Sequence, residues 1–318
     1  MFLLGLYLYK PHIRISIYHE EPPAENLTGC FGRVSRLYNV SQRIYGPKRT
    51  QIQSGMSLRR GHDCYAFAGT IQSHAVPEPT FYHTYSKAVP LLLINSFLAT
   101  QNLTNAILVL WSDQDSHYDD QTVLRYLSHL PDALSLRTLD IQELREEAPQ
   151  HSLNHPDLLR LLVLWNFGGV WLENDTILTR DLAPLLHHEF VTQPDCTTKQ
   201  DPGMMAHFHL QSPYVCEALS IPTLDWPKNL FQRLAKASIP PFATIPSCFV
   251  DGRACAPRLP EFSKQLGKQD EWVRDALAKI FAFRLGGDKA VPPKGWVKTL
   301  VLEKHERFLS RWNMGVGL

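Results

Sequence analysis

Two carboxylates, Glu173 and Asp175, stand two residues apart directly after a short apolar run. On an extended chain, side chains at positions i and i+2 point to the same side. Hard oxygen ligands that converge in this way suit Mg²⁺ or Mn²⁺, and such an ion can bridge a diphosphate and stabilise it as a leaving group. The same spacing also fits a solvated turn, so the interpretation depends on the elements around it.

A charged pair, Asp157 and Arg160, lies shortly before these carboxylates. Residues three apart share one face of a helix, so the two side chains are expected to meet near a helix N-terminus. An arginine there can bind phosphate through two parallel hydrogen bonds. The alternative is a structural ion pair without a ligand.

The elements that must position these side chains can be read from the run between them. Residues 156–167 are apolar at helical spacing, and Gly168 and Gly169 then end the predicted helix. Residues 170–172 are predicted to form a short apolar strand, and Glu173 and Asp175 follow it directly. In this context, a ligand site is favoured over a solvated turn.

The chain from residue 77 onward alternates between predicted strands and helices, which implies crossover units and a mainly parallel sheet. Ligands of such sheets bind at the carboxyl ends of the strands, and polar residues follow the apolar runs here. Beyond the run just described, we predict strands at 80–85, 106–111 and 134–139, and helices at 88–100 and 119–130.

Residues 1–76 show little periodicity and are predicted to be an irregular leader or stem, with one α/β domain over residues 77–318. The apolar run at residues 1–9 is shorter than the roughly 20 residues that cross a bilayer as a helix. It is either the remainder of a membrane anchor or a strand, and the sequence leaves both interpretations open.

Charge and cysteine usage exclude several classes of protein. The net charge of +1 gives no field that would recruit nucleic acid. The six cysteines form no C-x-x-C pair, so a zinc module is not expected. Cys248 and Cys255 could close a small disulfide loop, and buried free thiols are the alternative. Four N-glycosylation sequons, at Asn26, Asn39, Asn102 and Asn174, hint at the secretory lumen.

The run from His155 to Thr176 resembles the sugar-binding region of DXD glycosyltransferases of family 32 type, which include fungal Golgi mannosyltransferases and animal α-1,4-galactosyltransferases. The typical run there is S-D-L-L-R…Y-G-G-I-Y-L-D-x-D. The resemblance extends over roughly residues 77–302. Further segments that carry it are Phe81-Tyr82-His83-Thr84, Leu110-Trp111-Ser112-Asp113, Leu178–Leu182, Phe190–Gln193, His207-Phe208, Ser212–Tyr214 and Cys248–Arg253.

The resemblance implies a GT-A-like, Rossmann-like α/β fold and a role for each residue of the site. Asp157 and Arg160 would hold the donor sugar and its diphosphate. Asp175 would ligate a metal ion directly, with Glu173 touching the ion or its water shell. The remaining pocket residues, which would line the nucleotide site, are His83, Thr84 and Asp113.

Three features depart from the family's pattern. Glu173 replaces the usual first Asp and carries one more methylene. The loop after the metal site reads Asp201-Pro202-Gly203 instead of an Asn-Gly or Asn-Ala pair. The late segment that supplies a histidine ligand in the family reads Phe283–Lys289 and has no histidine. Arg284 occupies or adjoins the lost position, and Asp288 is a candidate substitute ligand.

The sequence therefore predicts a glycosyltransferase that moves a hexose from a UDP- or GDP-sugar to a glycan or glycoconjugate acceptor. The resemblance implies dependence on Mn²⁺ (or Mg²⁺), retention of anomeric configuration, and a place in the Golgi lumen, with a type II membrane anchor in full-length relatives. Two alternatives stay open: a catalytically degenerate relative that binds a nucleotide sugar or a partner, and a hydrolase of nucleotide sugars.

Overall fold

The computed structural model describes the greater part of the region from residue 79 onward, together with two short pieces of the leader. The described residues are 27–31, 64–71, 79–113, 121–146, 148, 157–193, 205–221, 226–237, 239–252, 258–285 and 295–310.

A seven-stranded sheet forms the centre of the molecule, with strand order β3-β2-β1-β4-β7-β6-β8. Every neighbouring pair is parallel except the two pairs that involve β7, which runs antiparallel to both β4 and β6. The strands are β1 (Thr80–Tyr85), β2 (Ala106–Ser112), β3 (Leu134–Thr138), β4 (Gly169–Leu172), β6 (Phe190–Gln193), β7 (Met205–Phe208) and β8 (Ala243–Pro246). A separate antiparallel pair joins β5 (Thr176–Leu178) to β9 (Ala282–Arg284).

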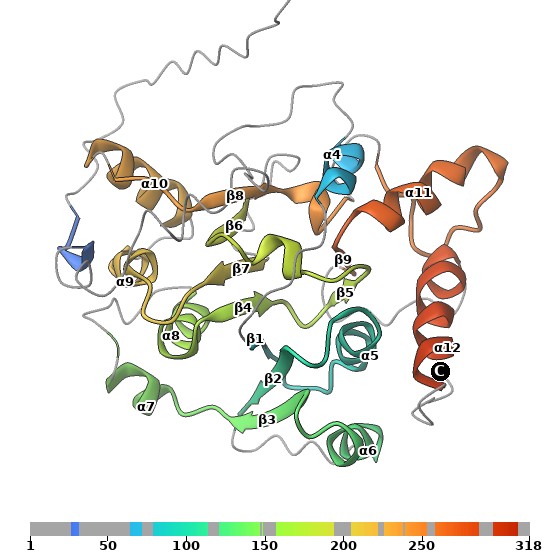
Figure 1. The fold of residues 1–318 in the computed structure, drawn as a ribbon, viewed down its shortest axis with the longest axis horizontal. Helices are drawn as coiled ribbons and strands as arrows, with labels where there is room; N and C mark the ends of the chain where they lie inside the picture. Colours follow the sequence, from blue (N-terminus) through green and yellow to red (C-terminus); the bar gives the residue numbers. More distant parts are fainter. Residues whose placement is uncertain are drawn as a thin grey trace, which may run out of the picture.

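Helices cover both faces of the sheet, as Figure 1 shows. One face packs on α4 (Cys64–Thr70), α5 (Leu91–Thr100), α6 (Gln121–His129), α11 (Glu271–Lys279) and α12 (Glu303–Ser310), the last following a π-helical segment (Val297–Leu302). The other face packs on α7 (Ile141–Glu146), α8 (Leu158–Phe167), α9 (Pro213–Leu219) and α10 (Trp226–Lys236). Side chains of β2 alternate between the two cores, with Leu108 and Leu110 on one side and Val109 and Trp111 on the other.

The predicted fold class is confirmed: the structure is a mixed α/β fold of GT-A-like type with a mainly parallel sheet between helices. The elements predicted between residues 80 and 172 are present, with their ends shifted by a few residues. The largest shift is at α5, which begins at Leu91 rather than at 88. Pro90 stands at its N-cap, and a proline is tolerated at a helix start but not inside a helix.

Two disulfides join the leader to the sheet domain. Cys30 is bonded to Cys216 in α9, and Cys64 is bonded to Cys248. The predicted small loop between Cys248 and Cys255 is therefore wrong, because Cys248 already has a distant partner. No cysteine among the described residues is free, and Cys196 and Cys255 lie outside those residues.

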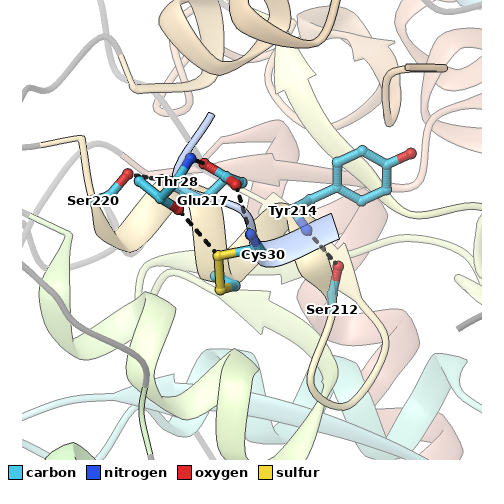
Figure 2. Close-up of a disulfide and its surroundings, with 7 residues drawn as sticks. Thr28, Cys30, Ser212, Tyr214, Glu217 and Ser220 are labelled. Carbon is cyan, nitrogen blue, oxygen red and sulfur yellow. Dashed lines mark hydrogen bonds between the residues drawn. A yellow bond between two sulfur atoms is a disulfide. The ribbon is translucent and has the colours of Figure 1, made fainter. Parts of the chain in front are cut away.

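A buried carboxylate reinforces the first of these disulfides. Glu217, beside Cys216 in α9, accepts hydrogen bonds from the backbone N–H groups of Thr28 (2.9 Å) and Cys30 (3.0 Å), and Figure 2 shows these contacts around the disulfide. Glu217 is fully buried, so the leader segment supplies partners that its carboxylate would otherwise lack.

The described parts of the leader thus pack on the domain, and the boundary at residue 76 stays a prediction. The N-terminal apolar run lies outside the described residues. Within the described ranges, no helix combines the length and apolar character that crossing a bilayer requires.

Candidate functional site

The carboxyl ends of β1 and β4 meet at the point where the strand order changes direction. From β1 the chain crosses to β2 on one side, while β4 lies on the other side. Such switch points open a crevice at the carboxyl edge of a parallel sheet, where ligands bind. The residues that follow the two strands touch there: Asn174 donates a hydrogen bond from Nδ2 to Ser86 Oγ at 3.1 Å.

Two glycines fix how the chain passes from α8 into β4. Gly168 ends the helix by donating its N–H to Leu164, and both Gly168 (φ 63°) and Gly169 (φ 90°) adopt positive φ. A Cβ on Gly169 would collide with the carbonyl oxygen of Phe81 in β1. The Gly-Gly pair therefore allows α8 and β4 to lie close to β1, and it places the N-terminus of α8 near the end of β4.

The carboxylate pair does not lie on an extended chain. The N–H of Thr176 donates to the carbonyl of Glu173 at 3.1 Å, which closes a four-residue turn before β5 begins. The side chain of Glu173 is 24% exposed and that of Asp175 is 5% exposed. Contrary to the expectation from the sequence, the pair therefore stands in a turn rather than on a strand, and each carboxylate has an arginine partner from a different element.

Arg160 links the start of α8 to the end of β4. Its Nη1 lies 3.7 Å from Asp157 Oδ1, and its Nη2 donates to Glu173 Oε1. Its guanidinium carbon also lies 5.8 Å from the centroid of the Trp171 ring. Besides this ion pair with Arg160, Asp157 accepts a hydrogen bond from Trp226 Nε1 in α10 at 2.8 Å. The sequence indicated the Asp157–Arg160 pair through its spacing but gave no signal for Trp226.

Asp175 is held by Arg284, the last residue of β9. Arg284 Nε lies 2.8 Å from Oδ1 of Asp175, and Arg284 Nη2 lies 3.4 Å from Oδ2. Because β5 and β9 are paired with Thr176 opposite Arg284, the backbone itself sets this contact. The family resemblance implies that Arg284 lies at or beside the position where relatives carry a histidine ligand. In the structure, Arg284 contacts the second carboxylate of the pair, Asp175.

His83 lies inside the core, in the middle of β1. Its side chain is 1% exposed, Trp111 Nε1 donates to its Nδ1 at 3.2 Å, and its Nε2 lies 2.9 Å from the Gly168 carbonyl. Since Nδ1 accepts a hydrogen bond, Nε2 carries the proton and donates it to Gly168. Burial lowers the pKa of His83 to about 3, so the ring is neutral. His83 thus connects β1, β2 and the Gly-Gly turn from within.

Thr84 and Asp113 occupy different surroundings. Thr84 is fully buried, and its hydroxyl has no hydrogen-bond partner among the described residues. Asp113 is half-buried at the end of β2 and accepts hydrogen bonds from the Tyr85 hydroxyl at 2.9 and 2.8 Å. Burial, together with this bond to Asp113, raises the pKa of Tyr85. Of the three residues predicted to line a nucleotide pocket, Asp113 is therefore the one that stays partly exposed at the end of a strand, whereas His83 and Thr84 are buried.

A cavity of about 350 Å³ opens beside β2, β3, α7 and α8. Trp111 forms part of its wall, together with Arg137, whose guanidinium carbon lies 4.8 Å from the centroid of the Phe167 ring. Since His83 bonds the indole of Trp111, the buried histidine helps to orient this wall.

The arrangement of donors does not fit a divalent ion. Magnesium requires a near-octahedral set of oxygen ligands, whereas Glu173 and Asp175 each contact an arginine. Across the described ranges, no three His, Cys, Asp or Glu side chains gather closely enough to hold a metal ion. Asp288 and residues 201–203 lie outside those ranges.

Comparison with known proteins bears on this part of the chain. Residues 92–192, from α5 to β6, match the model of a family described as "glycosyltransferase sugar-binding region containing DXD motif". The match includes all of α8, the Gly-Gly turn and the two carboxylates. It supports a DXD glycosyltransferase. Membership of family 32 in particular stays a prediction.

Solved structures and curated proteins add little to this assignment. One similar structure is described as PaToxG Glycosyltransferase, with 14% identity and a TM-score of 0.36 over 54% of this chain and 74% of that chain. Another is a transferase mutant, with 14% identity and a TM-score of 0.32 over 50% of this chain and 84% of that chain. Similarities of this size do not assign an activity. No curated protein matches the chain.

Proposed function

We propose that this protein transfers a hexose from a nucleotide sugar to a glycan or glycoconjugate acceptor. The observation that carries the proposal is the position of Arg160. It lies at the N-terminus of α8, contacts Asp157 and Glu173, and belongs to the segment that matches the sugar-binding region. A guanidinium beside carboxylates, at the switch point of a parallel sheet, suits a ligand that carries both phosphate and hydroxyl groups.

In this proposal Arg160 contacts the diphosphate, and Asp157 and Glu173 accept hydrogen bonds from sugar or ribose hydroxyls while they orient the guanidinium. During transfer the bond between the anomeric carbon and the phosphate oxygen breaks, and the nucleoside diphosphate leaves with the bonding electrons. The acceptor oxygen bonds to the anomeric carbon, and its hydroxyl proton is released. Fixed positive charge near the departing diphosphate favours this step. Retention of configuration is the outcome that the family resemblance implies.

The expected donors are UDP- or GDP-sugars, and the expected compartment is the lumen of the secretory pathway, in the Golgi. Two disulfides between distant segments support an oxidising compartment, because such bonds are rare in the cytosol. Membrane association through an N-terminal anchor stays a proposal from the sequence.

The arrangement of Asp175 and Glu173 does not favour the binding of Mn²⁺ that the family resemblance implies. Members of the matched family usually bind a divalent ion, but here both carboxylates are paired with arginines. No step of the proposed transfer is therefore assigned to a metal ion.

Release of nucleoside diphosphate from a panel of UDP- and GDP-sugars, with mixed glycan acceptors, tests the proposal. We expect release with at least one donor and a matching gain in acceptor mass. Arg160→Lys should lower the rate about tenfold or more, because lysine keeps the charge but cannot form two parallel hydrogen bonds to phosphate. Arg307→Lys, at an exposed position of α12, is the matched control and should keep the full rate.

A second candidate function, binding of a nucleotide sugar without turnover, is favoured by the Asp175–Arg284 pair, which takes up one carboxylate of the motif. Donor binding without consumption across the whole panel would select this candidate. If no donor is bound or consumed, both candidates are wrong.

A further inference from the structure

The ion pair between Asp175 and Arg284 is the most unusual feature of the site. Arg284 presents Nε and Nη2 to the two carboxylate oxygens of Asp175, at 2.8 and 3.4 Å. The side chain of Asp175 is 5% exposed and that of Arg284 is 15% exposed, so solvent screens the pair weakly. An ion pair in such surroundings strongly constrains both partners, because loss of either one leaves a buried charge uncompensated.

The backbone holds Arg284 in this place. β5 starts directly after Asp175 and pairs antiparallel with β9, which ends at Arg284. The next residue, Leu285, donates its N–H to the carbonyl of Asp175 at 3.1 Å. Asp175 is therefore bound to the end of β9 through both its main chain and its side chain. The contact does not depend on a long surface side chain that happens to reach a neighbour.

A guanidinium in this position competes with a divalent ion for the same oxygens. A metal ion on Asp175 would have to approach a carboxylate that already faces a fixed positive charge, and it would be repelled by that charge. Glu173 offers no easier route, because its Oε1 accepts a hydrogen bond from Arg160. The two carboxylates in the position of the DXD pair are thus each neutralised from within the chain.

We propose that Arg284 takes the place of the divalent ion, and that Arg284 and Arg160 together bind the donor's diphosphate without metal. This inference rests on the proposed function and identifies the positively charged side chains that bind the diphosphate at the same site. Arginine suits the role because its planar group matches the geometry of phosphate oxygens and stays charged at every physiological pH. Arg284 is then a donor-binding residue that the pairing of β5 with β9 holds in place, and the Asp175 carboxylate offsets its charge until a donor binds.

The charges of the described residues predict how the site responds to substitution. Asp157, Glu173 and Asp175 contact two arginines, so each carboxylate offsets positive charge that would otherwise act on a bound anion. Removal of the Asp175 charge should therefore favour an anionic diphosphate. If Asp175 instead ligated a metal, the same change would abolish binding. The two accounts predict opposite outcomes for one variant.

The first measurement is calorimetric titration of the full chain with UDP and with GDP, once in EDTA and once in Mn²⁺. We expect the tighter of the two nucleotides to bind with the same affinity, within about twofold, in both conditions. Binding that requires Mn²⁺ would overturn this inference and leave the proposed function standing. Absence of binding in both conditions would overturn the proposed function and this inference with it.

The second measurement repeats the EDTA titration with variants. Asp175→Asn should bind the nucleotide at least as tightly as the wild type. Arg284→Gln should bind about tenfold more weakly or worse, because it loses a charged hydrogen bond to phosphate. Since Arg284→Gln removes the arginine from the buried Asp175 carboxylate and could fail to fold, the double variant Asp175→Asn/Arg284→Gln provides a neutral pair of similar shape and should show the same loss. Arg307→Gln is the matched control, because Arg307 is exposed and, among the described residues, its side chain donates only to the Glu303 carbonyl of its own helix.

Loss of nucleotide affinity in Asp175→Asn would overturn the inference, as would wild-type affinity in the folded double variant. A result in which Asp175→Asn binds normally and both Arg284 variants bind weakly would support it.

Discussion

At the scale of single residues, the site is a series of charged contacts that spans three segments of the chain. Asp157 and Arg160 come from the start of α8, Glu173 and Asp175 from the turn after β4, and Arg284 from the end of β9. The spacing of Asp157 and Arg160 was sufficient to predict that they meet. No local pattern could predict the contact between Asp175 and Arg284, because 109 positions separate the two residues.

His83 provides a test of how the interior below the site is built. Its pKa is lowered to about 3 by burial, whereas an unfolded histidine titrates near 6.5. The unfolded chain therefore binds a proton that the folded chain does not. The stabilisation from neutral His83 is complete above about pH 6.5 and is lost as the pH falls from there toward 3. At its steepest, one such group changes the free energy of unfolding by about 1.4 kcal/mol per pH unit.

We expect denaturant unfolding between pH 6.5 and 4 to depend less steeply on pH in His83→Gln than in the wild type. The absolute stability of the variant will also change, so the slope with pH is the quantity to compare. His129→Gln, at an exposed position of α6, is the control and should keep the wild-type slope. Equal slopes in His83→Gln and wild type would mean that His83 is not held neutral by the fold.

At the scale of elements, the connection from α8 to β4 brings the charged residues to the end of the sheet. The sequence predicted this connection well, because an apolar helix, a Gly-Gly stop and a short apolar strand are all local patterns. It did not predict the turn at Glu173–Thr176. The length of a strand that ends in polar residues is decided by its partners, and here β5 pairs with β9 rather than with the main sheet.

The close approach of β4 to β1 leads to a prediction for Gly169→Ala. The alanine would require a strained positive φ, and its Cβ would collide with the Phe81 carbonyl. Backbone strain alone should cost about 1–3 kcal/mol, and relief of the collision would separate the two strands that form the switch point. We expect lower stability to urea and weaker nucleotide binding. Gly267→Ala is the control, because an added Cβ there has no neighbour closer than 4.0 Å. Stability equal to that of wild type in Gly169→Ala would contradict this account of the turn.

The elements after residue 180 show where prediction from sequence stops. β6, β7 and β8 have four residues each, and their places in the sheet depend on pairing with distant strands. Short apolar runs of this kind do not distinguish a strand from a buried helix by periodicity. The family resemblance includes short motifs in this region, but only the structure shows the order in which β6, β7 and β8 lie in the sheet.

At the scale of the whole molecule, the leader is joined to the domain at two separate places. The Cys30–Cys216 disulfide and the hydrogen bonds to Glu217 attach it to α9. The Cys64–Cys248 disulfide attaches it at the second place. Cysteine pairing could not be predicted from the sequence, because four or more cysteines allow several connectivities and spacing does not choose between them. Two described pieces of the leader, residues 27–31 and 64–71, are thereby linked to the sheet domain, and the domain boundary at residue 76 stays a prediction.

The central claim is that a nucleotide sugar binds at the carboxyl end of β4, between Arg160 and Arg284. Hydrogen–deuterium exchange tests it directly, with the tightest-binding UDP- or GDP-sugar added to the full chain. The account predicts slower exchange in peptides that cover residues 157–176 and 282–285, and unchanged exchange in α12. Slower exchange confined to other segments, or none at saturating donor, would contradict it.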